Sequence, residues 1–386
     1  MKPKLRFKNF NNEWEEIELK NIASEIAYGM NSASKEYDGE NKYIRITDID
    51  ENSNRYSNKD VVSPDGILED RFLVKENDIL FARTGASTGK TYLYNSNDGK
   101  LYYAGFLIKA SIINHNSNFI FQQTKLNKYN NWIKIMSMRS GQPGINSQEY
   151  GSYRFSITNI DEENKVSNFL SLIDKKIELQ SKKIEDLKLF KKGLNYKIFS
   201  NCKYEYTLKD ILMEYNKRTK VNNEYEVLSS TANGIYLQSE YFNKQAASND
   251  TTGYKIIPRG YITYRSMSDT GEFHFNIQNI VNYGIVSPAY PVFNIDETKV
   301  NKNYLIYYMN ENKNFINTIL STKEGGTRFA LSYSKLLSIK IKIPSREEQD
   351  QFASLISDIN KKIDLEKLKL DNINSLKKGL MQNMFV

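Results

Sequence analysis

Apolar residues follow a regular spacing in two long stretches of the chain, residues 166–199 and 352–385. In both stretches they recur at alternating steps of four and three residues, which is the spacing of a coiled-coil seam. Neither stretch contains proline, so each predicts one helix, about 50 Å long at 1.5 Å per residue. The apolar seam positions are Val166, Leu170, Ile173, Ile177, Ile184, Leu187, Leu194 and Ile198 in the first stretch, and Phe352, Ile356, Ile359, Ile363, Leu370, Ile373, Leu380 and Met384 in the second.

The two stretches are copies of each other at a constant offset, since Lys175 corresponds to Lys361, 186 positions later. Both seams are also interrupted by a polar residue at the same place, where Gln180 matches Glu366. A polar residue on a coiled-coil seam costs stability and fixes the register of the partner helix. The matched seams therefore predict that the helices pack on each other. Two separate amphipathic helices, each on its own domain, are the alternative, but the narrow seam favours the pair.

The segments that precede the two helices are also repeated, more loosely. Three pairs of segments correspond: Glu16–Glu25 with Glu205–Glu214, Asn77–Gly85 with Arg259–Met267, and Ser140–Ile157 with Gly325–Ile343. The second pair aligns Arg83 with Arg265, each after a short β-rich run. The order domain, helix, domain, helix predicts an α+β fold whose two half-chains are related by a pseudo-twofold axis.

Composition sets outer bounds on the class of protein. The chain has 386 residues, 39% of them hydrophobic, which is enough for two domain cores and the helices. No run of 18 apolar residues is present and the opening residues lack an apolar signal core, so we expect a cytoplasmic protein without membrane contact. The single cysteine, Cys202, cannot form an internal disulfide.

The charge is concentrated in the two helical stretches. The net charge of the chain is +8, and residues 166–199 with 352–386 carry fourteen Lys against eight acidic residues. A basic excess suits a polyanion such as nucleic acid, although a solvated lysine face on a coiled coil explains the same pattern.

Two short motifs suggest catalysis. The Thr84–Thr91 segment, TGASTGKT, differs from a phosphate-binding P-loop only in having Thr84 where the first glycine belongs. A P-loop must open a helix so that backbone N–H groups hold the phosphate, whereas the residues that follow Lys90 predict strand, turn and strand. Asp98 and Lys100 could serve a Mg²⁺-dependent nuclease, but Asn97–Lys100 is typical of a hairpin turn.

The sequence gives little support for a metal site or a catalytic nucleophile. The only histidines are His115 and His274, and with one cysteine they cannot form a His/Cys metal cluster. We therefore expect no metal site and no catalytic residue. A nucleotide-dependent enzyme, a nuclease and a coiled-coil scaffold that binds proteins only remain the alternatives.

The order of several short motifs resembles one known family, the specificity subunits of type I restriction–modification systems. The motifs are WEEIEL at Trp14–Leu19, YIRITDI at Tyr43–Ile49, DILFARTG at Asp78–Gly85, VSPAYPVF at Val286–Phe293 and IPSREEQDQF at Ile343–Phe352. The resemblance implies two target-recognition domains, residues 1–165 and 200–351, each reading half of a split site in double-stranded DNA. It also implies two spacer helices, residues 166–199 and 352–386, that form an antiparallel coiled coil and set the distance between the half-sites.

The same resemblance implies the partners and cofactors. Two methyltransferase subunits would bind around the spacer and carry out adenine methylation, and restriction–translocase subunits would complete the assembly. S-adenosylmethionine, ATP and Mg²⁺ would belong to those partners, so this chain would be non-catalytic and hold no cofactor. The halves differ where the helices start, because Thr158 and Glu163 stand where the second half has Pro344 and Gln349.

DNA reading requires Lys and Arg for phosphates, and Arg, Asn, Gln, Ser or Thr for base edges. Arg83 and Arg265 are the first candidates, because each follows a strand and precedes a polar loop. For every candidate, a surface ion pair or a loop hydrogen bond is the structural alternative. The candidates are Arg45, Arg83, Thr84, Lys90, Arg139, Gln142, Arg218, Arg259, Arg265, Ser266 and Arg328.

Overall fold

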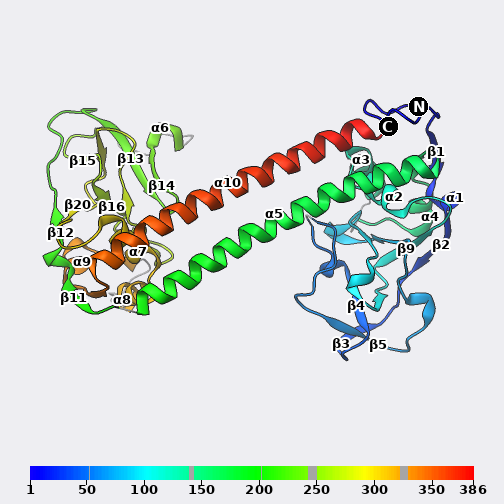
Figure 1. The fold of residues 1–386 in the computed structure, drawn as a ribbon, viewed down its shortest axis with the longest axis horizontal. Helices are drawn as coiled ribbons and strands as arrows, with labels where there is room; N and C mark the ends of the chain where they lie inside the picture. Colours follow the sequence, from blue (N-terminus) through cyan, green and yellow to red (C-terminus); the bar gives the residue numbers. More distant parts are fainter. Residues whose placement is uncertain (52, 139–142, 201, 242–249, 322–328) are drawn as a thin grey trace. The chain divides into compact units, whose positions relative to one another are not determined.

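The computed structural model describes residues 1–51, 53–138, 143–200, 202–241, 250–321 and 329–386 (Figure 1). These residues form two units. Unit 1 comprises residues 1–181 and 368–386, and unit 2 comprises residues 182–367. Both long helices contribute one part to each unit, so each unit contains residues from both halves of the sequence. None of the described helices is long and apolar enough to cross a membrane.

Unit 1 is built on an antiparallel sheet of four strands in the order β2-β9-β6-β7. The strand pairs β1–β10 and β3–β5 are antiparallel and the pair β4–β8 is parallel. Its strands are β1 (Glu15–Glu18), β2 (Ala23–Tyr28), β3 (Ala33–Glu36), β4 (Lys42–Ile44), β5 (Val62–Asp65), β6 (Asp78–Ala82), β7 (Thr91–Leu93), β8 (Leu101–Tyr103), β9 (Leu107–Ile112) and β10 (Arg154–Ile157). Its short helices are α1 (Leu19–Ile22), α2 (Ser117–Gln123), α3 (Asn127–Met136) and α4 (Ser147–Gly151).

Unit 2 repeats this plan with a four-stranded antiparallel sheet in the order β12-β20-β16-β18 and a terminal pair, β11–β22. A second sheet, β14-β13-β19-β15, and the pair β17–β21 complete it. The strands are β11 (Tyr204–Thr207), β12 (Leu212–Glu214), β13 (Glu226–Thr231), β14 (Gly234–Leu237), β15 (Lys255–Pro258), β16 (Ile262–Thr263), β17 (Met267–Ser268), β18 (Asn276–Ile277), β19 (Tyr283–Val286), β20 (Val292–Ile295), β21 (Phe329–Ala330) and β22 (Lys340–Ile343). The short helices are α6 (Gln238–Tyr241), α7 (Lys302–Glu311), α8 (Lys313–Ser321) and α9 (Tyr333–Ser338).

The two long helices are α5 (Ile160–Ser200) and α10 (Arg346–Met384). Each begins six residues before the stretch that carries the apolar repeat. The added first turn is acidic, and negative side chains near the N-terminus stabilise a helix through its dipole. Every residue of the seam is buried or half-buried, including the polar Gln180 and Glu366. Leu179 and Leu365, which lie off the seam, are exposed. The expected α+β fold with two long helices is confirmed.

The helices run antiparallel within each unit. In unit 1, Val166 near the start of α5 shares a core with Met384 near the end of α10, and further along Asp174 pairs with Lys377. In unit 2, the carboxylate of Glu366 on α10 lies 2.9 Å from the Lys183 ammonium on α5. The polar interruption of the α10 seam thus carries an ion pair with the partner helix, which favours this register over neighbouring ones.

The C-terminal end of each long helix enters the core of one unit. Phe385, directly after α10, packs against Trp14 and Phe119 in unit 1, with ring centroids 6.2 and 5.2 Å away. Phe199 of α5 packs in unit 2 against Tyr308 and Phe352, at 5.5 and 6.2 Å. These two phenylalanines are 186 positions apart in the sequence, so the repeat extends from the helices into both cores.

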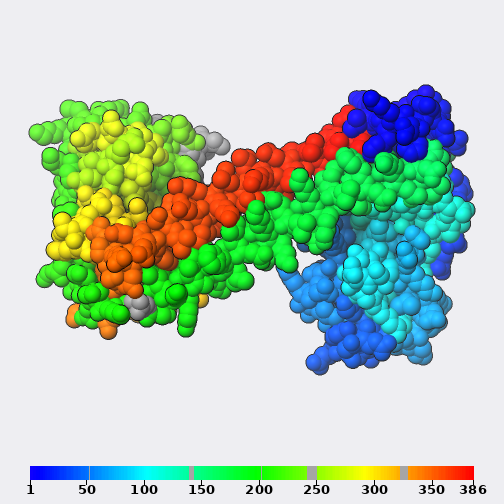
Figure 2. All heavy atoms as spheres, in the orientation of Figure 1, coloured from blue at the N-terminus to red at the C-terminus, as the bar shows by residue number. Residues whose placement is uncertain are grey.

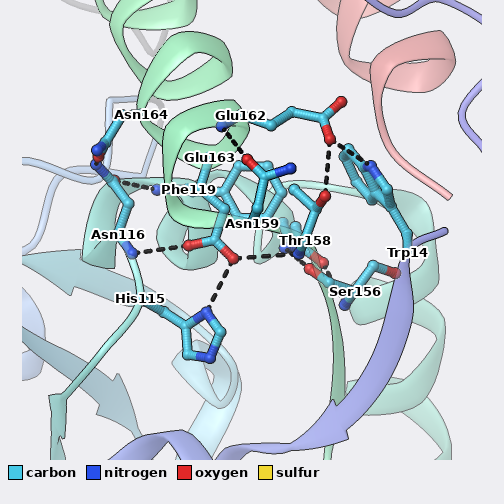
Figure 3. A network of polar contacts seen from close by, with 11 residues as sticks. Trp14, His115, Asn116, Phe119, Ser156, Thr158, Asn159, Glu162, Glu163 and Asn164 are labelled. Atoms are coloured by element: carbon cyan, nitrogen blue, oxygen red, sulfur yellow. Dashed lines mark hydrogen bonds and ion pairs between the residues drawn. The ribbon is translucent and has the colours of Figure 1, made fainter. Parts of the chain in front are cut away.

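A buried glutamate organises the start of α5 (Figure 3). Glu163 is fully buried, and its carboxylate accepts hydrogen bonds from the backbone N–H of Asn116, at 2.9 Å, and of Thr158, at 3.2 Å. His115 Nδ1 lies 2.9 Å from the same carboxylate. These contacts tie the start of the long helix to the end of β10 and to the cap of α2.

The start of α10 uses a glutamine for the same purpose. Gln349 Oε1 accepts from the backbone N–H of Asn301, whereas its Nε2 donates to the carbonyl of Pro344, each at 2.9 Å. Proline has no N–H to offer, so an acceptor-only glutamate could not make the second bond there. The exchange of Thr158 and Glu163 for Pro344 and Gln349 is therefore one coupled change that keeps both helix starts satisfied.

Glu162, the neighbouring residue, is also fully buried and holds the N-terminal segment. Arg6 donates to both carboxylate oxygens from Nε and Nη2, each at 2.7 Å, and the indole of Trp14 donates at 3.2 Å. Burial by itself raises the pKa of Glu162, but the hydrogen bonds from Arg6 and Thr158 outweigh it and the net pKa is lowered. Glu162 is therefore an ionised, fully paired group within unit 1.

We expect Arg6→Ala to destabilise the protein by about 3–5 kcal/mol, because it leaves the Glu162 carboxylate buried without its cation. Urea unfolding followed by the fluorescence of Trp14 and Trp132 measures the effect. Arg346→Ala is the matched control, since Arg346 pairs with Asp350 on the exposed face of α10 and should contribute roughly 0–1 kcal/mol. Equal losses in the two variants would contradict a structural role for the buried pair.

Candidate nucleic-acid interface

Arg83 follows β6 and sits where three loops of unit 1 meet. Its backbone N–H donates to the carbonyl of Phe106, at 3.0 Å, and its own carbonyl accepts from the N–H of Ile145, at 2.9 Å. The next residue, Thr84, forms a β-bridge with Gly144. These bonds join the loop after β6 to the β8–β9 turn and to the last loop before α4. The loop thus has a defined backbone on which side chains can be presented.

One aromatic side chain contacts the Arg83 guanidinium, and the residue that accepts the Arg83 backbone N–H is also aromatic. The guanidinium carbon lies 4.9 Å from the ring centroid of Tyr28, at the end of β2. Phe106 is 61% exposed and Tyr28 is 40% exposed. The Tyr28 hydroxyl accepts from Ser147, and although burial alone would raise the pKa of Tyr28, these bonds and the charge of Arg83 lower it. Arg83 makes no ion pair with any residue that the structure describes, so its charge remains available to a ligand.

The corresponding loop of unit 2 keeps the backbone pattern but changes the side chain. Leu331, the counterpart of Ile145 at an offset of 186, donates its N–H to the carbonyl of Ser266, at 2.8 Å. The following residue, Met267, pairs with Ala330 as Thr84 pairs with Gly144. Ser266 therefore occupies the position of Arg83, and the alignment of Arg83 with Arg265 is wrong by one residue at this loop.

Arg265 is exposed beside the β19–β20 turn. Its charge lowers the pKa of Tyr290, although burial dominates and the net pKa of that tyrosine is raised. The Ser266 hydroxyl donates to the carbonyl of Ala289 in the same turn, at 2.8 Å. Unit 2 thus also combines an arginine with an aromatic residue at this edge, in a different arrangement.

Four other predicted contact residues are engaged in structural bonds. Arg45 forms a two-point ion pair with Asp48, and this hydrogen bonding raises the pKa of Arg45. Arg259 clamps a turn through the carbonyls of Asn279 and Ile280, and Arg218 donates to the carbonyl of Gly253. Lys90 donates to the carbonyl of Ile49 and to the carboxylate of Glu51. Arg139, Gln142 and Arg328 lie outside the described residues.

The Thr84–Thr91 motif leads into a strand, β7, rather than a helix. The side chain of Lys90 is 13% exposed, and its ammonium donates to the carbonyl of Ile49 and to Glu51, both at 3.3 Å. The geometry therefore lacks the helix N-terminus that a P-loop uses to hold phosphate.

The residues considered for a nuclease are separately bonded. Asp98 accepts from the hydroxyl of Tyr92, at 2.7 Å, and Lys100 pairs with Glu40, at 3.1 Å. The hairpin expected at Asn97–Lys100 is wrong, because β7 pairs with β6 whereas β8 pairs with β4. Across the described residues, no group of three or more His, Cys, Asp or Glu side chains could hold a metal ion.

Three aromatic residues of these loops are absent from the candidates that the sequence provided, namely Tyr28, Phe106 and Tyr290. Phe106 had a signal in the sequence, since it follows Gly105 between two runs rich in apolar residues, which is the position of a turn. Tyr28 and Tyr290 had none, because they are two of the 27 tyrosines in the chain and no local pattern distinguishes them. Aromatic faces beside arginine suit contact with nucleic acid through stacking and cation–π interactions.

Comparisons with known proteins agree with this organisation. The family model described as "Type I restriction modification DNA specificity domain" matches residues 11–189 and 202–375. The type I restriction enzyme MjaVIII specificity subunit of Methanocaldococcus jannaschii is 21% identical over 357 residues, which cover 82% of this chain and 80% of the relative. The putative MjaX specificity subunit of the same organism is 21% identical over 410 residues, covering 96% and 92%.

Solved structures share the fold. The S subunit of a type I restriction–modification system from M. genitalium has a TM-score of 0.61 at 16% identity, with 100% of this chain and 99% of that chain covered. A structure from work on assembly and conformational transition of the type I system has a TM-score of 0.55 at 13% identity, covering 96% and 97%. At these identities the likeness shows a common fold.

Proposed function

The chain belongs to the family of type I restriction–modification DNA specificity domains, and from this premise we propose that it reads a bipartite DNA target and directs adenine methylation and restriction by partner subunits. The observation that carries the proposal is the internal repeat. The family model matches twice, and each match begins ahead of a four-stranded sheet whose strand end bears the loop at Arg83 or Ser266. Two such sites in one chain suit a target with two halves.

Each site combines a shared scaffold with different side chains. The backbone bonds to the last loop are equivalent in the two units, while Arg83 and Thr84 are replaced by Ser266 and Met267. Base edges are distinguished by the donors and acceptors of side chains, whereas the loop position depends on backbone contacts. We propose that this division lets the units read different half-sites, and that the aromatic residues of these loops also contact the DNA.

The helices would act as the spacer. α5 and α10 have matched seams, which supports an antiparallel pair that keeps a constant distance between the half-sites. Two methyltransferase subunits would dock on the helices, one for each half of the repeat, and restriction–translocase subunits would complete the assembly. S-adenosylmethionine, ATP and Mg²⁺ would be bound by those partners, in the cytoplasm. The bonded states of Lys90 and Asp98 support a chain that performs no catalysis itself.

Replacing residues 1–165 by the corresponding domain of a relative should change one half of the methylated sequence and leave the other half intact. Methylome sequencing of a host that carries the partner subunits with the original or the hybrid chain measures this. The host without this chain is the control, and it should lack the methylated motif altogether. A change in both halves would contradict two independent reading units.

On DNA that carries the methylated target sequence, Arg83→Ala should weaken binding by about 1–3 kcal/mol if the guanidinium makes a two-point base contact. A phosphate contact would instead lower affinity for every sequence and reduce the salt slope by about one. Arg45→Ala is the control in the same unit, since Arg45 is paired with Asp48 and should affect unfolding rather than DNA affinity. Unchanged binding by Arg83→Ala would exclude Arg83 as a residue that contacts DNA.

Removing Lys176–Lys182 and Lys362–Leu368 together should shorten the preferred gap between half-sites. Seven residues keep the heptad phase and remove about 10.5 Å of helix at 1.5 Å per residue. At about 3.4 Å per base pair this corresponds to roughly three base pairs. Selection from a DNA library with random spacers, with the methyltransferase partner present, measures the gap.

Three base pairs also rotate one half-site by almost a third of a turn, at about 10.5 base pairs per turn. The shortened chain should therefore bind more weakly while preferring the shorter gap. A shortened chain that folds, assembles and selects the original gap would show that helix length does not set the spacing.

A further inference from the structure

A hollow of about 630 Å³ lies in unit 2 between the last turns of α5 and the junction of α7 with α8. Figure 2 shows the C-terminal part of α5, in green, at the surface of the molecule. Phe199 of α5 is half-buried and lines the hollow, while its ring also packs on Tyr308 and Phe352 in the core. Tyr196, one turn earlier, lines the hollow too and is 80% exposed. The hollow therefore has an aromatic wall that is open to solvent.

Lysine side chains surround this aromatic wall. Lys188, Lys191 and Lys192 line the hollow from α5, and Lys313 lines it from the first turn of α8. Among the described residues of the lining, Glu311 is the one acid, which leaves an excess of three positive charges. None of the four lysines forms an ion pair with a residue that the structure describes. Their charge is therefore available to an anionic group from outside the chain.

The internal repeat gives Lys191 a counterpart that has an acidic partner. At an offset of 186 this counterpart is Lys377, whose ammonium lies 2.5 Å from the carboxylate of Asp174 in unit 1. At the same offset Asp174 corresponds to Asn360, which carries no charge. Lys191 is half-buried, and its ammonium lies 5.2 Å from the ring centroid of Tyr307. The second half of the chain thus keeps the lysine and replaces the acid by a neutral amide.

We propose that this hollow binds an acidic segment of a partner protein that carries one aromatic residue. We call the site the lysine pocket and define it by Lys188, Lys191, Lys192, Tyr196 and Lys313. The aromatic side chain of the segment would enter the hollow against Tyr196. The carboxylates on either side of it would meet the lysines, so that opposite charges face each other across the contact.

A protein segment suits the lysine pocket better than duplex DNA does. The affinity of a protein for duplex DNA comes largely from cations that follow the phosphates along the outside of a rigid helix, and an apolar hollow adds nothing to it. A flexible acidic segment can instead place one side chain in the hollow, where buried aromatic anchors supply much of the binding energy of protein interfaces. The inference does not depend on DNA reading by either unit.

A labelled synthetic peptide of sequence Glu-Glu-Asp-Phe-Asp-Glu-Glu provides the probe, titrated into the full-length protein by fluorescence anisotropy. We expect saturable binding of one peptide per chain, and an affinity that falls as the salt concentration rises, because salt screens exposed charges. A peptide with serine in place of the phenylalanine should bind about tenfold more weakly or worse, because it lacks the apolar side chain.

Variants of the protein locate the site. Lys192→Glu and Lys313→Glu should each weaken the peptide by about tenfold or more, because each replaces an attraction by a repulsion. Tyr196→Ala should weaken it through loss of the aromatic contact. Lys182→Glu is the matched control, because it changes the net charge equally at an exposed position of the same helix, about 15 Å before Lys192 at 1.5 Å per residue. It should change binding less than about twofold, since that distance exceeds the screening length at physiological salt.

All four substituted positions are exposed, so folding should be preserved, which circular dichroism checks. Binding lost in Lys192→Glu and Lys313→Glu but kept in Lys182→Glu supports the proposal. No saturable binding, or an equal loss in these three variants, overturns it.

Two further measurements test the other occupants. Duplex DNA of random sequence that displaces the peptide, and that binds more weakly to Lys192→Glu but not to Lys182→Glu, would show that the lysine pocket contacts the DNA backbone and would overturn the proposal. Sedimentation without peptide would overturn it if the chain forms a dimer that dissociates in Lys313→Glu, because a second copy would then cover the pocket.

Discussion

The constraint on which the structure depends is that each long helix contributes buried side chains to the cores of both units. α5 enters the core of unit 1 with Val166 and Leu170 and the core of unit 2 with Ile198 and Phe199, and α10 does the reverse with Phe352 and Met384. A helix fixed at both ends has little freedom in length or rotation. The seven-residue period, the shared 186-residue offset and the ion pair at Glu366 all follow from that demand.

The two halves of the repeat keep the same backbone arrangement at the helix starts, whereas the side chains that bind this backbone differ between the halves. Glu163 and Gln349 each bind the residue that leads into their helix. Glu163 accepts the backbone N–H of Thr158, whereas Gln349 donates its amide to the carbonyl of Pro344, which has no N–H. A substitution of glutamate by glutamine preserves the shape of the side chain and changes only its hydrogen-bonding groups. Here each residue is tied to its partner, since an unsatisfied buried polar group costs about 1–3 kcal/mol.

The same separation of scaffold and chemistry appears at the loop after β6 and its counterpart. The carbonyls of Arg83 and Ser266 receive equivalent N–H groups, so the loops have a common anchor although their side chains differ. Asymmetry enters a second time through the N-terminal residues 1–12, which have no copy ahead of unit 2 because the last turns of α5 precede that domain. Phe7 packs against Phe169, whereas Leu355, the counterpart of Phe169 at an offset of 186, is exposed.

The sequence by itself determined the parts of the molecule that depend on local periodicity. Alternating steps of three and four residues specify a helix and its buried stripe whatever surrounds them, so both helices and the residues on their seam could be predicted. The paired domains followed from the repeat. The tertiary structure decided which charged residues form ion pairs or hydrogen bonds within the protein, because such bonds join residues far apart in the chain. Lys90 meets Glu51 and Arg6 meets Glu162 only after folding. It also decided the alignment of the recognition loops. Whether Arg83 corresponds to Arg265 or to Ser266 depends on which carbonyl accepts a hydrogen bond from a loop about sixty residues away, and no local pattern records that choice.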